Sequence, residues 1–351
     1  MAEENQTTHK RRVRYSGKYP KKFEEKYKEL QPEKYKDTIE HVIKKGNTPA
    51  GMHISIMVNE ILDFLKIQPG ETGFDATLGY GGHTKAMLQC LKGQGHIYAT
   101  DVDPEESART RKRLEEAGFG EDILTIRLQN FCTIDEIAKE AGGFDFILAD
   151  LGVSSMQIDN PKRGFSFKVD GPLDLRLNQE AGISAAERLA AITKDELAGM
   201  LYENSDEPYC EELAKAITDE IRKGNRIDTT TKLRNIIEKT LDFLPEKEKK
   251  DTRKKTCQRT FQALRIDVNR EFEVLYEFME KLPDALKPGG RAAILTFHSG
   301  EDKLVKKALK EGYRAGIYAD YAKDVIRPSA QECAQNGRAR STKMRWAIKA
   351  E

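Results

Sequence analysis

The sequence predicts an α/β protein: a mostly parallel sheet with helices on both faces, interrupted after its fourth strand by a mainly helical segment. Three observations support this prediction. From Met52 to about residue 160, short apolar runs alternate with amphipathic runs, a pattern typical of parallel strands joined by helices. Strand-like runs then stop, and charged, helix-like runs follow as far as about Thr256. The buried strand-like run AAILTF comes after Gly290, so the first pattern resumes.

The elements can be taken in chain order. Residues 1–48 are rich in Lys, Glu and Tyr and poor in aliphatic residues, which predicts an appended arm, partly helical at best. An amphipathic helix is expected in HISIMVNEILDFL, before the turn at Pro69-Gly70. A helix opened by Pro104 and closed by Gly118 should follow the second strand. The first four strands are expected to end in GFD, GHIYATD, ILTIRLQNF and FDFILAD.

The second half of the chain is expected to begin with a Gly/Pro-punctuated loop, RGFSFKVDGPLDLRLN, and to continue as helices such as KDELAGMLYE. One long helix is expected in TFQALRIDVNREFEVLYEFMEKLPDAL, followed by a turn, KPGG, that feeds the fifth strand. The tail RARSTKMRWAIKA suits a last strand. We therefore expect a sheet domain from residues 49–160 and 257–351, with residues 161–256 as an inserted helical domain.

Composition sets outer limits on function. The formal net charge of the 351 residues is +1, so binding to a polyanion would have to use local basic patches. The five cysteines are scattered without a CxxC pair, which predicts reduced thiols rather than a disulfide framework or a metal site. No apolar run suits a signal peptide or a membrane span, so we expect a soluble, cytoplasmic protein.

A glycine-rich turn, FDATLGYGGHT, follows the first strand. A strand, such a turn and a helix form the first unit of a nucleotide-binding sheet, in which ligands lie beyond the carboxyl ends of the strands. Gly79 and Gly81 fit the dinucleotide pattern GxGxxG, but Thr84 stands at its third position. S-adenosylmethionine is the competing ligand, because it needs the loop only to pass close to its amino-acid portion. The loop alone leaves both ligands open.

Two later residues bear on an adenosine. Asp101 ends the second strand about 20 residues after the loop, where a carboxylate can accept both ribose hydroxyls of either ligand. Its alternative role is to cap the helix at Pro104, for which Asp103 is better placed. Phe131, after the third strand, suits either an adenine ring or the core.

The ends of the fourth and fifth strands bear on the reaction. Asp150 stands where amino-group methyltransferases carry an acid or amide that accepts a proton of the target amine. Such an amine has its lone pair delocalised into the base, so catalysis must come from orientation and electrostatics. His298 ends the fifth strand on the same rim; it suits either a proton relay or a structural role. No Tyr-x-x-x-Lys pair for hydride transfer was found, which disfavours a nicotinamide dehydrogenase.

Together the motifs resemble a known family. The blocks DATLGYGGHT, DLGVSSMQIDNPKRGFSFKVDGPLDLRLN, RTFQALRIDVNREFE, PGGRAAILTFHSGEDKLVK and RPSAQECAQNGRARSTKMR resemble, in order, those of the MraW (RsmH) family, over residues 52–347. The family comprises bacterial S-adenosylmethionine-dependent methyltransferases that modify N4 of a cytidine in the decoding centre of 16S rRNA. The resemblance implies a Rossmann-like class I methyltransferase sheet with an inserted helical domain. By this resemblance, the donor-binding positions of the family correspond to Gly81, Gly82, His83, Asp101, Phe131, Asp150 and Gln157. We add Gly79, which lies in the same loop, to the expected donor-binding residues.

Some positions depart from the family pattern. Gly300 stands where Leu is usual, and Gly337-Arg338-Ala339 replaces Pro-Arg-Ser. These departures suggest a divergent branch or paralogue, so the donor and reaction type are predicted more firmly than the target nucleotide.

We expect Asp150 and His298 to be the catalytic pair, and 16S rRNA or the small ribosomal subunit to be the partner. Basic residues interleaved with aromatic ones suit phosphate contact and base stacking. The RNA contacts expected on this basis are Arg163, Phe165, Phe167, Arg176, Arg259, Arg265, Arg338, Arg340 and Lys343, and Lys10 to Arg14 of the arm could add to them.

Three alternatives remain open at this point: a nicotinamide dehydrogenase, a methyltransferase acting on another rRNA base or on DNA, and a non-catalytic RNA-binding factor. The sequence does not decide between a monomer and a homodimer.

Overall fold

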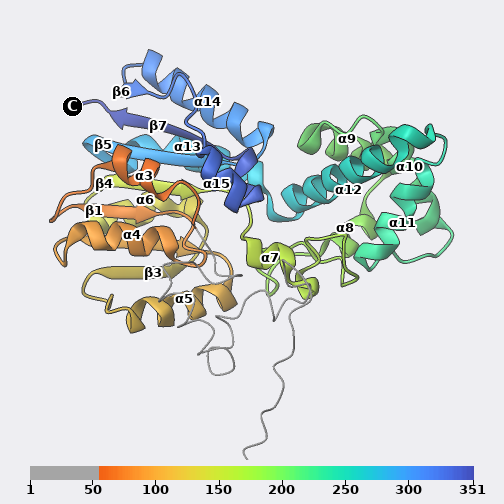
Figure 1. Cartoon of the computed structure of the whole chain (residues 1–351), viewed down its shortest axis with the longest axis horizontal. Helices are drawn as coiled ribbons and strands as arrows, with labels where there is room; N and C mark the ends of the chain where they lie inside the picture. Colours follow the sequence, from red (N-terminus) through yellow and green to blue (C-terminus); the bar gives the residue numbers. More distant parts are fainter. Residues whose placement is uncertain (1–54) are drawn as a thin grey trace, which may run out of the picture. The chain divides into compact units, whose positions relative to one another are not determined.

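A seven-stranded sheet with helices packed on it forms one part of the structure, and the helices α8 to α12 lie beside it (Figure 1). The computed structural model describes residues 55–351, and the expected N-terminal arm lies outside them. The strand order is β3-β2-β1-β4-β5-β7-β6; all neighbouring pairs are parallel except those of β7, which runs antiparallel to β5 and β6. This confirms the Rossmann-like α/β fold. The strands are β1 Thr72–Asp75, β2 His96–Asp101, β3 Leu124–Leu128, β4 Phe144–Asp150, β5 Leu286–Thr296, β6 Tyr318–Tyr321 and β7 Lys343–Lys349.

Helices cover both faces of the sheet, and the alternation of side chains along the strands shows why. In β4, Ile147 packs with one face and Leu148 with the other; in β5, Ile294 and Leu295 do the same, and all four side chains are fully buried. Strands buried on both faces read as continuous apolar runs, which is how they appear in the sequence. The covering helices are α3 Val58–Leu65, α4 Gly82–Leu91, α5 Pro104–Glu116, α6 Ile134–Ala141, α13 Glu271–Ala285 and α14 Ser299–Arg314.

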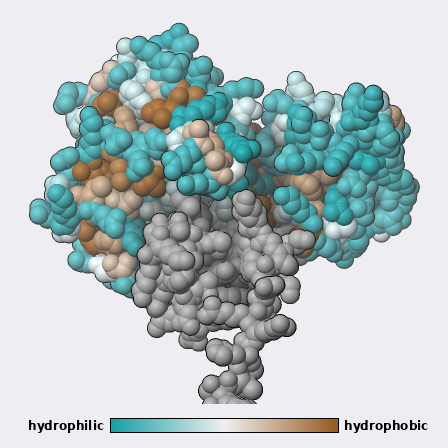
Figure 2. All heavy atoms as spheres, viewed as in Figure 1, coloured by the Kyte–Doolittle hydropathy of each residue, from teal (hydrophilic) through white to brown (hydrophobic). Residues whose placement is uncertain are grey.

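The segment between β4 and α13 is helical and has its own apolar core, in which Leu197, Leu213, Ile237 and Phe261 are buried. On the face shown in Figure 2, hydrophilic residues cover most of this segment. Its elements are α7 Ser155–Asp159, η3 Pro161–Arg163, α8 Ala185–Ala191, α9 Lys194–Ser205, α10 Cys210–Arg222, α11 Thr230–Thr240 and α12 Glu246–Asn269. The boundary expected at residues 256/257 lies inside α12, so that helix belongs to both parts of the chain.

The single long helix expected before the fifth strand is in fact two. α12 ends at Asn269, Arg270 adopts a left-handed conformation with φ +52°, and α13 begins at Glu271. The Asn269 amide explains the break, because it donates to the Leu175 carbonyl and accepts from the Leu177 amide, 2.8 Å each. These contacts lie more than 90 residues away in sequence, so no local pattern could signal them.

Three smaller elements also differ from expectation. The KPGG segment, expected as a turn, belongs to β5, whose pairing with β4 shifts register between Phe144 and Phe146. β6 is a short edge strand that the sequence pattern did not indicate. The expected last strand is confirmed as β7, although it runs between β5 and β6. Within residues 55–351, no helix has the length and apolar character that crossing a membrane requires.

Candidate functional site

Four strands bring their last residues to one edge of the sheet. β1, β2, β4 and β5 are parallel, so Asp75, Asp101, Asp150 and Thr296 all lie at carboxyl ends that meet there. In open α/β sheets this edge is where ligands bind. Two of these acids, Asp101 and Asp150, were identified from the sequence.

The glycine loop is held against this edge by its own backbone. The Gly79 amide donates to Asp101 Oδ2 at 2.7 Å, and its carbonyl accepts from Thr110 Oγ1 at 2.5 Å. Gly81 has φ +81°, and a Cβ there would lie 2.6 Å from the Thr110 methyl group. A Cβ on Gly82 would collide with the Ser55 hydroxyl. The loop therefore needs glycine for both conformation and space.

Asp101 serves the loop and not the following helix. Besides the Gly79 contact, its Oδ1 accepts from the Asp103 amide at 2.9 Å. Asp103 caps α5, accepting from the amides of Glu105 and Glu106, as the sequence favoured. Burial is the main cause that raises the Asp101 pKa to about 6, although both amide hydrogen bonds oppose it.

Asp150 has unusual surroundings for a strand-end acid. Its Oδ1 is shielded from solvent and has no hydrogen-bond partner among the described residues, and its Oδ2 lies 3.5 Å from His83 Nδ1. Burial raises its pKa to about 6, against the attraction of His83 and with the repulsion of Asp75 and Glu301. A carboxylate oxygen without a donor is able to accept a hydrogen bond from a ligand.

His83 is fixed from its other side. Its Nε2 lies 2.9 Å from the Ile56 carbonyl, and its side chain is only 8% exposed. The Asp75 carboxylate nearby is occupied by Thr84 Oγ1 and the Thr77 amide. His83 is thus held between the start of α3 and the end of β4.

Gln157 and Arg163 meet at Asp103 rather than at the glycine loop. Gln157 Nε2 and Arg163 Nη1 both donate to Asp103 Oδ2, at 2.9 and 2.6 Å. Gln157 Oε1 accepts from the Ser154 amide in a capping box at the start of α7. This buried cluster ties the donor-side acids to the RGFSF segment.

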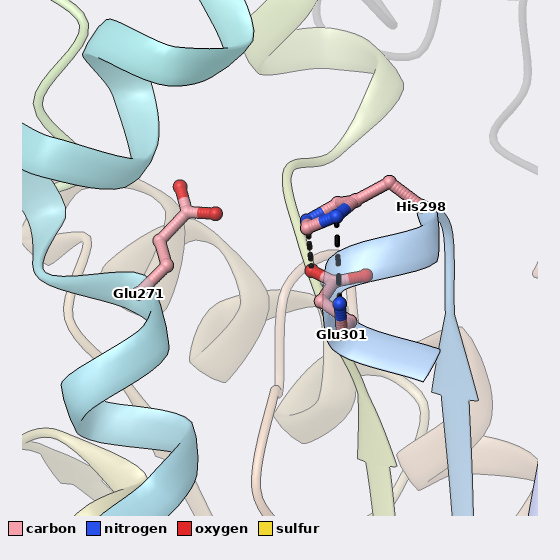
Figure 3. A group of neighbouring side chains, drawn as sticks. All are labelled: Glu271, His298 and Glu301. Carbon is pink, nitrogen blue, oxygen red and sulfur yellow. Dashed lines mark hydrogen bonds and ion pairs between the residues drawn. The ribbon is translucent and has the colours of Figure 1, made fainter. Parts of the chain in front are cut away.

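His298 caps α14, and Glu301 lies beside it (Figure 3). His298 Nε2 is 3.1 Å from Glu301 Oε1, and its Nδ1 accepts from the Glu301 amide at 3.5 Å. Glu301 Oε2 also accepts from the Phe297 amide at 2.8 Å. Burial alone would raise the pKa of Glu301, but hydrogen bonds with His298 and the Phe297 amide and the attraction of His298 and Arg265 keep it below its usual value. A buried carboxylate of this kind fixes the orientation of the imidazole ring.

Glu271 completes a group of three possible metal ligands with His298 and Glu301, whose ligand atoms lie within 4.8 Å of one another. Both Glu271 oxygens, however, accept from Arg265, at 2.7 and 2.8 Å. This guanidinium already neutralises Glu271, so the geometry does not call for a cation there.

Phe131 begins a short 3-10 helix, Phe131–Thr133, and packs edge-on against Phe278 with ring centroids 5.2 Å apart. It is partly buried against the core, so one side of the ring has a structural partner. Contact with an adenine ring stays a prediction.

Two of the expected RNA contacts lie inside the protein. Arg163 is 5% exposed and Phe165 is 8% exposed, so neither presents a surface to RNA. The Arg163 guanidinium donates hydrogen bonds to Asp103 and to the carbonyls of Arg176 and Leu177. Phe165 packs in the core of the helical segment. The expectation of RNA contact is therefore wrong for these two residues.

The other expected RNA contacts differ in exposure and in the residues that they contact. Phe167 packs edge-on against Phe261. Arg340 is exposed, whereas Arg259 is 39% exposed and lies 3.9 Å from Glu207. The other basic candidates are engaged in ion pairs: Arg176 with Asp174, Arg265 with Glu271, Arg338 with Asp159, and Lys343 with Asp302.

The sequence did not single out Thr110, Thr77 or a site role for Glu301. Thr110 anchors the loop from the middle of α5, and Thr77 Oγ1 accepts from the Asp150 amide at 2.7 Å. These contacts join residues more than 30 positions apart, and threonine gives no pattern that would single them out. Glu301 did carry a signal, since it stands three residues after His298 at a helix start.

Comparisons with known proteins all point to one family. A model of the MraW methylase family matches residues 50–350. "Ribosomal RNA small subunit methyltransferase H 1" of Agathobacter rectalis is 86% identical over 351 residues, all of both chains. The protein of the same name from Lachnoclostridium phytofermentans is 70% identical over 99% of this chain and 95% of its own. "Ribosomal RNA small subunit methyltransferase H 2" of Alkaliphilus metalliredigens is 64% identical over 97% of each chain.

Proposed function

Because the chain belongs to the MraW methylase family, we propose that it transfers a methyl group from S-adenosylmethionine to N4 of a cytidine in the decoding centre of 16S rRNA. The relatives are named as methyltransferases of small-subunit ribosomal RNA. The observation that carries the proposal is that the glycine loop, Asp101 and Asp150 converge at one edge of the sheet.

The residues present fit such a donor. Gly81 and Gly82 pack closely against Thr110 and Ser55, whereas a Cβ on Gly79 would have only the Thr77 carbonyl oxygen within 4 Å, so a ligand can approach the loop backbone at Gly79. Asp101 is the carboxylate available for ribose hydroxyls, and the orphaned Oδ1 of Asp150 is available for a polar N–H. His83, Phe131 and Gln157 complete the proposed donor side. When bound, the donor supplies an electrophilic methyl group on a sulfonium.

Asp150 is proposed to orient the target amine. Its carboxylate accepts a hydrogen bond from one N4–H, which turns the nitrogen lone pair toward the methyl group, so catalysis comes from orientation rather than from a strong base. With a pKa raised to about 6, the side chain is mainly ionised at neutral pH. The target base must leave its stack to reach this depth, as for other enzymes that act on base atoms.

His298 is proposed to take up the surplus proton. Glu301 holds the ring at both nitrogens, because its carboxylate lies 3.1 Å from His298 Nε2 and its amide donates to His298 Nδ1. Proton uptake at Nδ1 would replace that amide contact. Proton uptake by water is the alternative, and the pH profile of a His298→Gln variant separates the two.

The proposal also covers the cellular location of the enzyme and its RNA substrate. The enzyme is proposed to act in the cytoplasm on 16S rRNA or the small ribosomal subunit, with residues 161–256 as a substrate-recognition domain. The alternative is the same donor chemistry on another rRNA base or nucleic acid. The oligomeric state, monomer or homodimer, does not enter the mechanism.

A reconstituted assay tests the proposal. Purified protein, labelled S-adenosylmethionine and small-subunit RNA should give labelled N4-methylcytidine. An Asp150→Ala variant should lose methyl transfer while still binding the donor, measurably but more weakly. Tight binding of NADH with no binding of S-adenosylmethionine would contradict the donor assignment.

A further inference from the structure

A cavity of about 350 Å³ lies between the carboxyl end of α9 and the first turns of α14. One wall includes Asn204 and its neighbours, and the other includes Phe272, from the start of α13, and residues of α14. None of the proposed donor-binding residues lines it, so the cavity is distinct from the donor site. Its volume falls within the range of small-molecule pockets and suits one nucleotide rather than a peptide or a duplex.

Phe272 provides an aromatic wall that depends on Gly300. A Cβ on Gly300 would lie 2.5 Å from Phe272 Cζ and 2.9 Å from Cε1, so any larger residue at position 300 would displace the ring. Gly300 does not have a positive φ, so the glycine is required here for space and not for conformation. The Phe272 ring is also edge-on to His298, with centroids 5.8 Å apart. The cavity therefore borders the proposed proton acceptor.

The two walls carry opposite charges. Lys303 and Lys307 lie one turn apart on α14, and neither has an ion-pair partner among the described residues. Glu203 and Asp206 stand on the α9 wall and are likewise unpaired among residues 55–351. The lysines and the carboxylates thus face the same space without neutralising one another.

This arrangement selects the occupant. A simple anion would suit the lysines but would be repelled by Glu203 and Asp206, and a cation would meet the reverse problem. A nucleotide satisfies both walls, because its phosphate is anionic while the amino group of adenine, cytosine or guanine donates hydrogen bonds. Its base also has a π-face for Phe272, and single-stranded RNA is commonly held by such stacking together with basic side chains.

We propose that the α9–α14 cavity holds one unstacked, amino-bearing nucleotide of the RNA substrate, close in sequence to the methylated cytidine. Its base stacks on Phe272, its amino group faces Glu203 and Asp206, and its phosphate contacts Lys303 and Lys307. The proposal rests on the proposed function, since it names a further recognition element of the same RNA. It assigns part of the substrate specificity to residues outside the donor site.

The first test compares two lysine pairs on one helix. Lys303→Ala/Lys307→Ala removes the cavity lysines, and Lys306→Ala/Lys310→Ala removes exposed lysines that do not line it. With a single-stranded fragment of small-subunit RNA as the probe, the cavity pair should lower the salt dependence of binding, the slope of log K against log[salt], by about 1 to 2. The control pair should leave that slope close to wild type. Equal slopes for the two double variants would overturn the proposal.

The second test identifies the nucleotide. Phe272→Leu should weaken RNA binding about 5- to 100-fold, the usual range for loss of one stacked base. The fragment is then scanned with single abasic positions. At one position the abasic RNA should bind wild type and Phe272→Leu equally, while at the other positions the difference persists. A uniform difference at every position would contradict a dedicated nucleotide site.

The two failures are distinguishable. If wild-type protein methylates no cytidine in any ribosomal RNA, the proposed function fails. If wild type is active but the lysine and abasic tests show no cavity effect, only the nucleotide cavity is wrong. Affinity for S-adenosylmethionine, measured in each variant, should equal that of wild type because no donor-site residue is changed.

Discussion

His83 and Asp150 face each other with their polar atoms 3.5 Å apart, while the opposite nitrogen of His83 contacts the Ile56 carbonyl. A carbonyl oxygen only accepts, so His83 Nε2 carries a hydrogen. This contact fixes the orientation of the ring and turns Nδ1 toward Asp150 Oδ2.

The first prediction concerns the pH dependence of methyl transfer. Asp150 must be ionised to accept the hydrogen bond from the amine, and burial raises its pKa to about 6. Activity at saturating substrates should therefore fall as the pH drops through about 6, whereas an unperturbed aspartate would hold activity down to about 4. The measurement is the initial rate between pH 5 and 9. A profile that stays flat to pH 5 would remove Asp150 from the role.

The second prediction concerns stability, and its sign follows from the same shift. The folded pKa of Asp150 lies above its unfolded value, so the native state binds more protons in the window between about 4 and 6. The ionised side chain thus works against folding, and this penalty is complete above pH 6. Asp150→Asn should raise the free energy of unfolding at neutral pH by an amount on the order of 1 to 3 kcal/mol, while reducing activity. Urea unfolding at pH 4 and at pH 7.5 measures the gain, which should shrink at the lower pH.

Asp103→Asn is the matched control with the opposite sign. Hydrogen bonds from Gln157 and Arg163, with the charge of Arg163, keep the Asp103 pKa below its usual value despite burial. Its stabilisation is present above the unfolded pKa and is lost as the pH falls through the folded one. The Asn variant should therefore destabilise the protein at neutral pH. Equal signs for the two variants would refute the electrostatic explanation.

The third prediction concerns Arg163, which the RGFSF motif favoured as an RNA contact. Arg163 and Asp103 form a buried ion pair at 2.6 Å, with side chains 6% and 2% exposed. Arg163→Ala leaves Asp103 without its charge partner and should cost about 3 to 5 kcal/mol of stability. The salt dependence of RNA binding by the folded fraction should not change. Arg340→Ala, at an exposed position, should show the reverse: unchanged stability and a smaller salt slope.

The fourth prediction concerns the glycine loop. Gly81→Ala meets Thr110 at 2.6 Å and has to adopt φ +81°. Donor affinity, measured by calorimetry, should fall at least tenfold, because the loop must move away from α5. Gly142→Ala is the control: it has φ +74° with nothing within 4 Å of the added Cβ. Gly142→Ala should lower the free energy of unfolding by a similar amount, because alanine is also strained at a positive φ, while its donor affinity stays unchanged.

Much of the fold could be predicted because strand ends and helix starts carry local signals. The glycine run, the aspartates that end β1, β2 and β4, and Asp103 at a helix start are local patterns, and the structure confirms the architecture they indicate. Which basic side chains form ion pairs could not be predicted, because their partners are distant in sequence. Arg163 and Asp103 are 60 residues apart, and Arg338 pairs with Asp159 across 179. A basic motif reports a charge but not whether that charge is already neutralised.

Nucleoside mass spectrometry with site mapping shows whether this protein makes N4-methylcytidine in 16S rRNA. The RNA is compared from cells with the gene, without it, and with the gene encoding Asp150→Ala. N4-methylcytidine should occur at one decoding-centre position in the first sample and be lost in the other two. Unchanged N4-methylcytidine in all three samples would contradict the assignment of this enzyme to that base.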